Sequence, residues 1–441
     1  MKFNMELELT REMNKALDIV CNTKEHVFIT GKAGTGKTTL LKYLMEHTNK
    51  KCVVAAPTGI SAINAGGVTL FSLLNIPFGP IPPTGKIEEI RMKKEKIDLL
   101  RDLDTLIIDE ISMVRSDLLD YVDKKLQIIR RSSLAFGGMQ LVMFGDLFQL
   151  PPVVKSEDKA ILDAFYTNTY FFNSWVFKYQ SFFNVIELTH IFRQSDPNFI
   201  SILNSIREYN VSRDQLEILD EARDRKISQD FDNEYVHICT YKRDVEAINS
   251  EKLGVPTDVF KANVTGDFPK NAAPCDLVLS IRKGAKVMTL VNDPAKQYSN
   301  GTLGVIMEIK PSEILLKLDN GKLVNVSRCK WSNFKYSSVR GEITKEEIGS
   351  CVQFPVTLAW AITIHKSQGL TFNKVSLHMS HAFCPGQLYV ALSRCRSLEG
   401  IVSDSFIKKD MIIPDQPLLD FEEKYKKANN KYGKIEETLA L

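Results

Sequence analysis

Short apolar runs alternate with helix-like patterns through the first part of the chain. Apolar residues dominate four stretches, near residues 26–30, 52–56, 105–109 and 140–145. Each stretch has the length of a buried strand, and this rhythm predicts a parallel β-sheet with crossover helices. A second α/β rhythm begins after Arg193, with predicted strands near residues 235–240 and 355–360.

Two segments interrupt these rhythms. Residues 75–103 begin with prolines and glycines that cannot continue a helix or a central strand, and a charged helical piece follows. We interpret them as an inserted subdomain or loop. Residues 285–352 hold short β-like runs separated by Asn-Gly turn signals, which predicts a small antiparallel barrel. The runs are Ala285–Leu290, Gly304–Lys310, Glu313–Leu318 and Lys322–Val326.

Composition restricts the class of protein without identifying a ligand. The 441 residues are enough for two or more domains, and a net charge of +3 does not by itself indicate nucleic acid. The 8 cysteines are scattered without a C-x-x-C pair, which disfavours a disulfide framework or zinc site and favours a reducing compartment. We see neither a targeting signal nor an apolar run of the ~20 residues that a membrane span needs, so we expect an intracellular soluble protein, nucleoid-associated or nuclear.

The strongest chemical pattern is a phosphate-binding loop of the form G-x-x-x-x-G-K-T at residues 31–38, between an apolar stretch and a helical pattern. Glycines let backbone N–H groups converge on phosphates, Lys37 adds a positive charge, and Thr38 offers a hydroxyl to Mg²⁺. The alternative is a flexible glycine turn. The predicted nucleotide contacts are Gly34, Thr35, Gly36, Lys37, Thr38 and Thr39.

A pair of acids follows the apolar run at residues 105–108. Asp109 and Glu110 would lie at the carboxyl edge of a parallel sheet, where ligands of open α/β folds bind. Asp109 can hold Mg²⁺ through water, and Glu110 can polarise the attacking water. Two solvated acids at a strand end are the alternative. With the phosphate loop, the pair predicts a nucleotide triphosphatase core.

The segment at 144–153 places Gln149 just past a strand end, where its amide could sense a γ-phosphate. Alone it would suit a polar turn, but with the nucleotide motifs it resembles motif III of the superfamily-one helicases. Further segments then follow in that family's order. Residues 55–59 resemble motif Ia, 188–194 motif IV, 363–371 motif V and 388–394 motif VI.

Within that superfamily the chain resembles the PIF (petite integration frequency) family and the related RecD-like helicases. Three segments carry this resemblance: residues 363–369 in the form T-I-H-K-S-Q-G, Val287-Met288 together with residues 300–304, and the stretch 121–144. The resemblance spans roughly residues 8–405. It implies an ATP-dependent helicase that moves 5′→3′ on single-stranded DNA. It further implies activity on G-quadruplexes and displaced strands, and roles in DNA repair, recombination and telomere maintenance.

The resemblance implies an α/β fold with two RecA-like parallel-sheet P-loop NTPase domains and two inserted subdomains, one an SH3-like β-barrel. We expect the first motor domain, 1A, to comprise residues 1–74 and 104–190, with the wedge-bearing subdomain 1B at 75–103. The second motor domain, 2A, would comprise 191–284 and 353–420, with the SH3-like subdomain 2B at 285–352. Residues 421–441 would form a lysine-rich tail, whose helical pattern at 421–434 predicts a solvated helix face.

Site residues carry over from the matching motifs. Arg193 and Arg394 lie in the second α/β unit, opposite the phosphate loop, and an arginine on the transferring phosphoryl group is worth roughly 10³–10⁵ in rate. A cleft that closes on ATP and opens after hydrolysis could therefore drive a cyclic motion. The alternative for both arginines is that they form ordinary salt bridges on the surface. The implied catalytic residues are Lys37, Asp109, Glu110, Gln149, Arg193 and Arg394, with Gly369 added to the nucleotide contacts.

The implied cofactors are ATP and Mg²⁺, the metal held by Thr38 and Asp109. The implied partners are single-stranded and forked DNA, and no membrane partner is expected. We expect the protein to be a monomer in solution, and a dimer on DNA is an open alternative. The implied DNA contacts are Pro57, Thr58, Gly59, Thr363, His365 and Lys366. For His365 and Lys366, an ordinary helix start is the alternative.

Two positions depart from the family's pattern. Met13 stands where the family usually has a glutamine that reads adenine, so base selectivity is relaxed or Asn14 serves instead. Phe71 stands where a histidine is usual, and it either packs inward or stacks on a base. Other activities open to such a chain are an ATP-driven translocase and an ATP-switched DNA-binding protein without unwinding.

Overall fold

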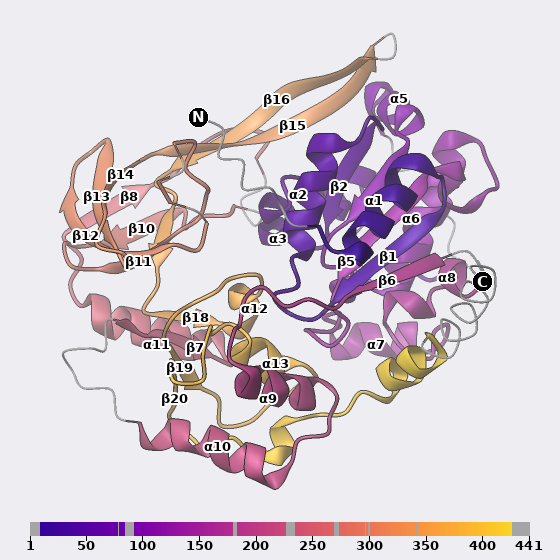
Figure 1. Cartoon of the computed structure of the whole chain (residues 1–441). Coiled ribbons are helices and arrows are strands. Elements are labelled where there is room, and N and C mark those ends of the chain that lie inside the picture. Colours follow the sequence, from indigo (N-terminus) through magenta and orange to yellow (C-terminus); the bar gives the residue numbers. More distant parts are fainter. Residues whose placement is uncertain are drawn as a thin grey trace.

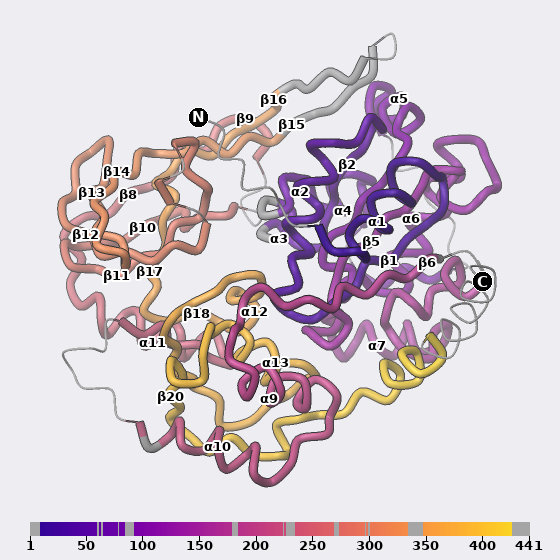
Figure 2. Tube along the Cα trace, viewed as in Figure 1, coloured from indigo at the N-terminus to yellow at the C-terminus, as the bar shows by residue number. Residues whose placement is uncertain are grey.

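A computed structural model places the named strands β1 to β20 in two parallel sheets and three antiparallel sheets (Figure 1). It describes residues 9–77, 79–83, 92–179, 183–225, 234–268, 273–295, 297–298, 300–339 and 342–425 (Figure 2). The expected α/β class with two parallel-sheet units is confirmed.

The first unit is a six-stranded parallel sheet in the order β3-β2-β4-β5-β1-β6. Its strands are β1 (His26–Gly31), β2 (Cys52–Ala56), β3 (Val68–Thr69), β4 (Thr105–Ile108), β5 (Gln140–Gly145) and β6 (Phe183–Leu188). All four strands predicted in this part of the chain are present. The helices are α1 (Arg11–Asn22), α2 (Lys37–His47), α3 (Gly59–Asn64), α4 (Leu70–Leu74), α5 (Lys94–Asp102), α6 (Ser116–Arg130), α7 (Ser156–Leu162) and α8 (Trp175–Tyr179).

The central strands of this sheet are buried on both faces. Phe28 of β1 packs into one hydrophobic core, whereas its neighbours Val27 and Ile29 pack into another. Successive strand residues point to opposite faces, so a continuous apolar run fills both cores at once. Phe71 packs against the first of these cores, in agreement with the inward alternative for that residue.

The second unit is a four-stranded parallel sheet in the order β18-β7-β19-β20. Its strands are β7 (Val236–Cys239), β18 (Ala361–Thr363), β19 (Val375–His378) and β20 (Ile401–Ser403), and its helices are α9 (Pro197–Arg207), α10 (Arg213–Asp224), α11 (Lys242–Leu253), α12 (Ile364–Ser367) and α13 (Gln387–Leu392). The strand predicted near 235–240 is present. A strand is present near 355–360, but the prediction that it belongs to this sheet is wrong. This strand, β17 (Val356–Leu358), pairs antiparallel with β11 (Lys286–Thr289).

Antiparallel strands occupy the region between β7 and β18. A five-stranded sheet in the order β14-β13-β12-β11-β17 contains all four predicted runs, including β12 (Leu303–Ile309), β13 (Glu313–Leu318) and β14 (Leu323–Ser327). Antiparallel pairing also extends outside 285–352, through β8 (Asp258–Lys261), β9 (Asn263–Gly266) and β10 (Val278–Ile281). The SH3-like barrel and the domain boundaries stay predictions.

A long hairpin of β15 (Cys329–Val339) and β16 (Glu342–Gln353) reaches from the antiparallel region to the first unit, where β15 lies against α5 (Figure 1). Helix α5 confirms the charged helical piece predicted within 75–103, and residues 84–91 of that segment lie outside the described residues.

The last described segment, a helix at 416–425, returns to the first unit (Figure 1). Phe421 stacks on Phe172 with ring centroids 4.3 Å apart, and the Tyr425 hydroxyl donates to the Val185 carbonyl at 2.6 Å. The exposed Lys424 agrees with the predicted solvated face, while the opposite face packs on the first unit; residues 426–434 lie outside the described residues. Across the described chain, no helix is both long and apolar enough to span a bilayer.

Candidate nucleotide cleft and adjoining cavity

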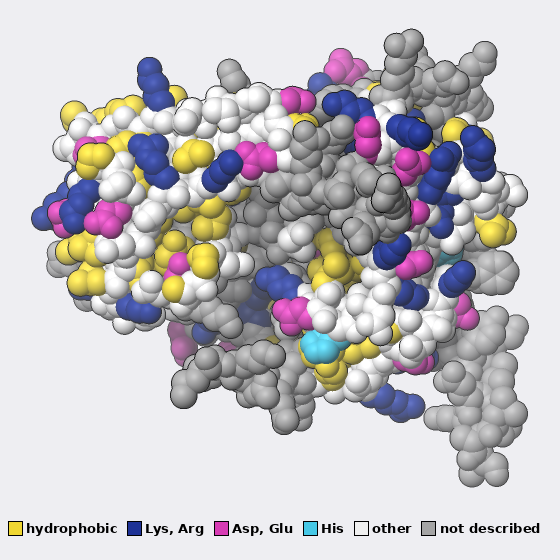
Figure 3. Space-filling model, turned by 90° about the horizontal axis from the view of Figure 1, so that it is seen from above, with side chains coloured by type: hydrophobic (Ala, Val, Ile, Leu, Met, Phe, Trp, Pro, Cys, Tyr) yellow, Lys and Arg dark blue, Asp and Glu magenta, His cyan; other side chains and the backbone are white. Residues whose placement is uncertain are grey.

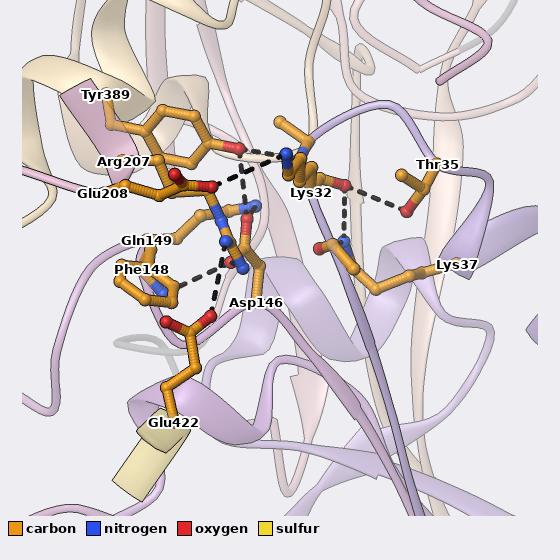
Figure 4. Close-up of polar contacts among 12 residues, drawn as sticks. Lys32, Thr35, Lys37, Asp146, Phe148, Gln149, Arg207, Glu208, Tyr389 and Glu422 are labelled. Atoms are coloured by element: carbon orange, nitrogen blue, oxygen red, sulfur yellow. Dashed lines mark hydrogen bonds and ion pairs between the residues drawn. The ribbon is translucent and has the colours of Figure 1, made fainter. Parts of the chain in front are cut away.

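The phosphate loop joins β1 to α2. Gly34 and Gly36 have φ of 85° and 84°, a left-handed backbone that favours glycine, and Gly36 caps the start of α2. The Lys37 ammonium donates to the carbonyls of Gly31 at 2.6 Å and of Lys32 at 3.0 Å (Figure 4). Amide groups and a cation therefore converge at a helix N-terminus, which is an anion site.

A cavity of about 470 Å³ surrounds this loop, and both α/β units line it. The first unit supplies the loop, Glu110 and Gln149; the second supplies Gly369 and Arg394; Arg193 comes from the segment that joins the units. The structure thus brings together every predicted nucleotide contact and every predicted catalytic residue except Asp109. The lining residues are Ala33, Gly34, Thr35, Gly36, Lys37, Thr38, Thr39, Glu110, Gln149, Phe192, Arg193, Gly369, Thr371, Arg394 and Arg396.

Of the two acids after β4, Asp109 is buried and Glu110 is half-buried. Burial, followed by the charge of Glu110, raises the pKa of Asp109 to about 7. Burial also raises the pKa of Glu110, against the opposing effect of the Lys37 and Arg394 charges. Glu110 has φ 52° and ψ 46°, an uncommon conformation for a residue with a side chain, and such strain concentrates at functional sites. Perturbed carboxyl groups in a cleft are candidates for acid–base chemistry.

The two arginines are held differently. Arg394 is buried and donates to the carbonyls of Val390 (2.8 Å), Ser367 (3.4 Å) and Leu370 (3.3 Å). Arg193 donates to the Ser393 carbonyl at 3.2 Å. Burial, then the neighbouring charge of Arg193, lowers the pKa of Arg394 to about 9. Two cations side by side favour a highly charged anion between them.

A buried polar cluster joins the two units behind the phosphate loop (Figure 4). Asp146, at the end of β5, accepts from Arg207 of α9 at 3.4 Å and from the Tyr389 hydroxyl of α13 at 3.3 Å. Tyr389 in turn accepts from the Ala33 amide of the loop at 2.9 Å. The Arg207 guanidinium lies 4.0 Å from the Phe148 ring centre and 3.8 Å from Glu422 of the terminal helix. This cluster, which we call the Asp146 cluster, therefore links the loop to the second unit.

A second cavity of about 580 Å³ adjoins the first and shares Thr38, Glu110 and Gly369 with it. Of the predicted DNA contacts, Thr58, His365 and Lys366 line it, as does Asp109. The other lining residues are Lys42, Ser61, Met113, Leu290, Val291, Asn292, Asn300, Gln368 and Leu370. Seen from above, basic and acidic side chains are interspersed over both sides of the molecule (Figure 3).

Three predicted DNA contacts lie elsewhere. Pro57 and Gly59 are not among the described residues that line either cavity. Thr363 caps α12, because its hydroxyl accepts from the Lys366 amide at 3.1 Å. It therefore fixes the start of the helix that carries His365 and Lys366.

Sequence reasoning missed several lining residues. Phe192, Thr371 and Arg396 lie within or next to recognised motifs, so their positions beside Arg193, Gly369 and Arg394 could have identified them. Asn292, between β11 and β12, has no local pattern that would point to a cavity, and the Asn300-Gly301 pattern predicts a turn without showing what the turn lines.

The donors present suit Mg²⁺. No cluster of three or more His, Cys, Asp or Glu side chains that could hold a metal ion occurs in the described part of the chain. Thr38 and Asp109 nevertheless offer a hydroxyl and a carboxylate oxygen to the same cavity. Mg²⁺ in nucleotide sites takes only one or two protein ligands besides phosphate oxygens and water, so this pair is sufficient.

Comparisons with known proteins agree with these motifs. The family model described as PIF1-like helicase matches residues 8–217. ATP-dependent DNA helicase Pif1 of Bdellovibrio bacteriovorus is 32% identical over 425 residues, which covers 94% of this chain and 92% of that protein. ATP-dependent DNA helicase PIF1 of Danio rerio is 34% identical over 89% of this chain, and the match spans only 60% of the zebrafish protein.

Solved structures with this fold include Pif1 from Bacteroides sp in complex with ADP-AlF4, with a TM-score of 0.89 and 56% identity, covering 96% of this chain and 98% of that one. Bacteroides Pif1 bound to ssDNA has a TM-score of 0.73 with the same identity and coverage. A structure of two coordinating Pif1 helicases unwinding forked dsDNA is 54% identical, with a TM-score of 0.73 and coverage of 96% and 98%.

Proposed function

The chain belongs to the PIF1-like helicase family and is an ATP-dependent DNA helicase, and we propose that it moves 5′→3′ along single-stranded DNA. The observation that supports a motor most strongly is the cleft between the two parallel-sheet units. The phosphate loop and Glu110 lie on one side of it, and Arg394 lies on the other. A nucleotide bound there would contact both units, so binding and hydrolysis would change their relative position.

We assign hydrolysis to the residues of this cleft. Lys37 would neutralise the phosphates, Glu110 would accept a proton from the attacking water, and Gln149 would orient the γ-phosphate. Arg193 and Arg394 would stabilise the transition-state charge, which requires both units to be in place. Thr38 and Asp109 would hold Mg²⁺, which shields the phosphate charge when bound.

We assign the second cavity to the DNA strand. Thr58, His365 and Lys366 line it, and Lys366 is exposed at the start of α12. Side chains and helix starts of this kind bind phosphate without reading sequence, as a motor that must move along any strand requires. Pro57, Gly59 and Thr363 would support this path from the adjoining turns.

The substrates we propose are single-stranded and forked DNA, with G-quadruplexes as a further substrate. Related structures contain ssDNA and forked dsDNA, which supports the first two. We propose a monomer in solution and two cooperating copies on forked DNA. Its place would be with DNA inside the cell, in the nucleoid or nucleus.

A translocase that does not unwind and an ATP-switched binding protein are the rival activities. Strand displacement on duplexes with a 5′ tail or a 3′ tail, with and without ATP, distinguishes them. We expect displacement of only the 5′-tailed duplex, only with ATP. Displacement of the 3′-tailed duplex would contradict the polarity.

DNA-stimulated hydrolysis without displacement would favour the translocase. A switch would show little DNA-stimulated turnover. Lys37→Ala should lose hydrolysis with or without DNA, and it is the control for both the strand-displacement and the hydrolysis measurements.

A further inference from the structure

The nucleotide cleft has an apolar end beside Gly36. Phosphates held by residues 34–38 would direct the attached nucleoside away from Glu110 and Arg394, past this glycine. Phe192 lines the cleft there and is 53% exposed. Its backbone amide donates to the Gly34 carbonyl at 2.8 Å, so the backbone of Phe192 is fixed to the loop.

Met13 of α1 approaches the same point. A Cβ built on Gly36 would lie 3.1 Å from the Met13 methyl carbon and 3.6 Å from two atoms of the Phe192 ring. Met13 is buried, at 3% exposure. A thioether has no N–H donor and is a weak acceptor, so it provides polarisable contact without hydrogen-bond readout.

Two polar side chains of the described residues lie near this end. The amide nitrogen of Asn14 already donates to the carbonyls of Leu9 at 3.3 Å and Thr10 at 3.1 Å, which directs this side chain toward its own backbone. Arg396, which lines the cleft, carries only donors, and the N7 acceptor that a donor could reach occurs on both adenine and guanine.

We propose that this cleft accepts nucleoside triphosphates with little selectivity among bases, because Phe192 stacks on the base and the buried Met13 behind Gly36 offers it no hydrogen-bond donor. The proposal rests on the function proposed above and specifies its substrate class: purine and pyrimidine triphosphates drive the motor. Stacking tolerates every base, since each has a π-face. Sites that discriminate through apolar contact reach only about 10–200-fold, whereas hydrogen-bonding sites reach about 10⁴–10⁵-fold.

The test measures kcat/KM for ATP, GTP, CTP and UTP with saturating single-stranded DNA. Competition of each nucleotide against a fluorescent ADP analogue gives affinities independently of hydrolysis. We expect the wild-type values for ATP and GTP to lie within about 10-fold of each other. A preference for ATP above about 200-fold, the limit of apolar discrimination, would overturn the proposal.

Met13→Gln supplies the amide that pairs with adenine, and Met13→Leu is the matched apolar control. We expect Gln to raise the ATP-to-GTP ratio at least about 10-fold and Leu to leave it unchanged. Equal ratios in both variants would remove Met13 from base selection. Phe192→Ala should weaken all four nucleotides alike, by about 5- to 100-fold.

Failure of the proposed function gives a different result. The four nucleotides would then compete for binding as expected while DNA failed to stimulate hydrolysis of any of them. Thermal unfolding of each variant identifies loss of fold, and the wild-type ratio remains decisive if a variant does not fold.

Discussion

The nucleotide cleft and the second cavity share a wall but are built differently. In the cleft, charged side chains are fixed by partners from other elements: the carbonyls of Ser367 and Leu370 hold Arg394, and the Asp146 cluster ties the loop to the second unit. In the second cavity, Lys366 is exposed, and the Thr58 hydroxyl contacts Ser61, three residues further along the chain. Transition-state stabilisation needs preorganised charges, whereas a strand in motion needs contacts that form and release.

The largest expected effect tests the cleft. Glu110→Gln keeps the size and shape of the side chain but removes the base, so turnover should fall by about 10²–10⁴-fold. Nucleotide affinity should change little, because the phosphate loop is intact. Steady-state hydrolysis and nucleotide competition measure the two quantities. Normal turnover would exclude Glu110 from catalysis.

The next largest expected effect is on the free energy of unfolding, when a residue of the Asp146 cluster is replaced. Arg207→Met would leave Asp146 buried without its ion-pair partner, and breaking such a pair costs about 3–5 kcal/mol. Arg213→Met is the matched control, because Arg213 pairs with Glu217 on the exposed surface of α10, where an i,i+4 pair is worth about 0.3–0.5 kcal/mol. Denaturant unfolding measures both. A loss below about 1 kcal/mol for Arg207→Met would mean that the cluster is not a structural link between the units.

The same contrast explains what the sequence could predict. The phosphate loop is one continuous segment after β1, and Asp109 and Glu110 are adjacent residues after β4, so local pattern places both segments at the carboxyl edge of the sheet. The run at 355–360 shows the limit, since apolar residues do not reveal whether Val356 pairs antiparallel with β11 or parallel with β7. Asn292 reaches the second cavity through a loop whose path depends on the whole antiparallel region.

The terminal helix shows a second limit. Its lysines predict a solvated face, but Phe421 on the other face packs against a sheet more than 200 residues earlier in the chain, beside Val185. Charge pattern identifies the exposed side of a helix and gives no information about which core receives the other side.

A moderate effect is expected where the two cavities meet. The Gln368 amide donates to Glu110 at 2.9 Å and to Gln149 at 3.3 Å, so it links the second unit to the base. Gln368→Ala should lower DNA-stimulated hydrolysis by about 10- to 150-fold, the value of one hydrogen bond to a charged group. The ratio of hydrolysis with and without DNA measures this. A fall by the same factor without DNA would mean that Gln368 positions Glu110 irrespective of DNA.

The smallest expected effect tests the DNA side. Lys366→Ala removes one exposed cation from the second cavity, so DNA affinity should fall a few-fold and the slope of log affinity against log salt should decrease by about 1. The effect should be the same for all DNA sequences, because a phosphate contact reads none. Lys155→Ala is the control, since Lys155 is equally a surface cation but lines neither cavity. Titration of labelled single strands at several salt concentrations gives both slopes, and an unchanged slope for Lys366→Ala would place the strand away from α12.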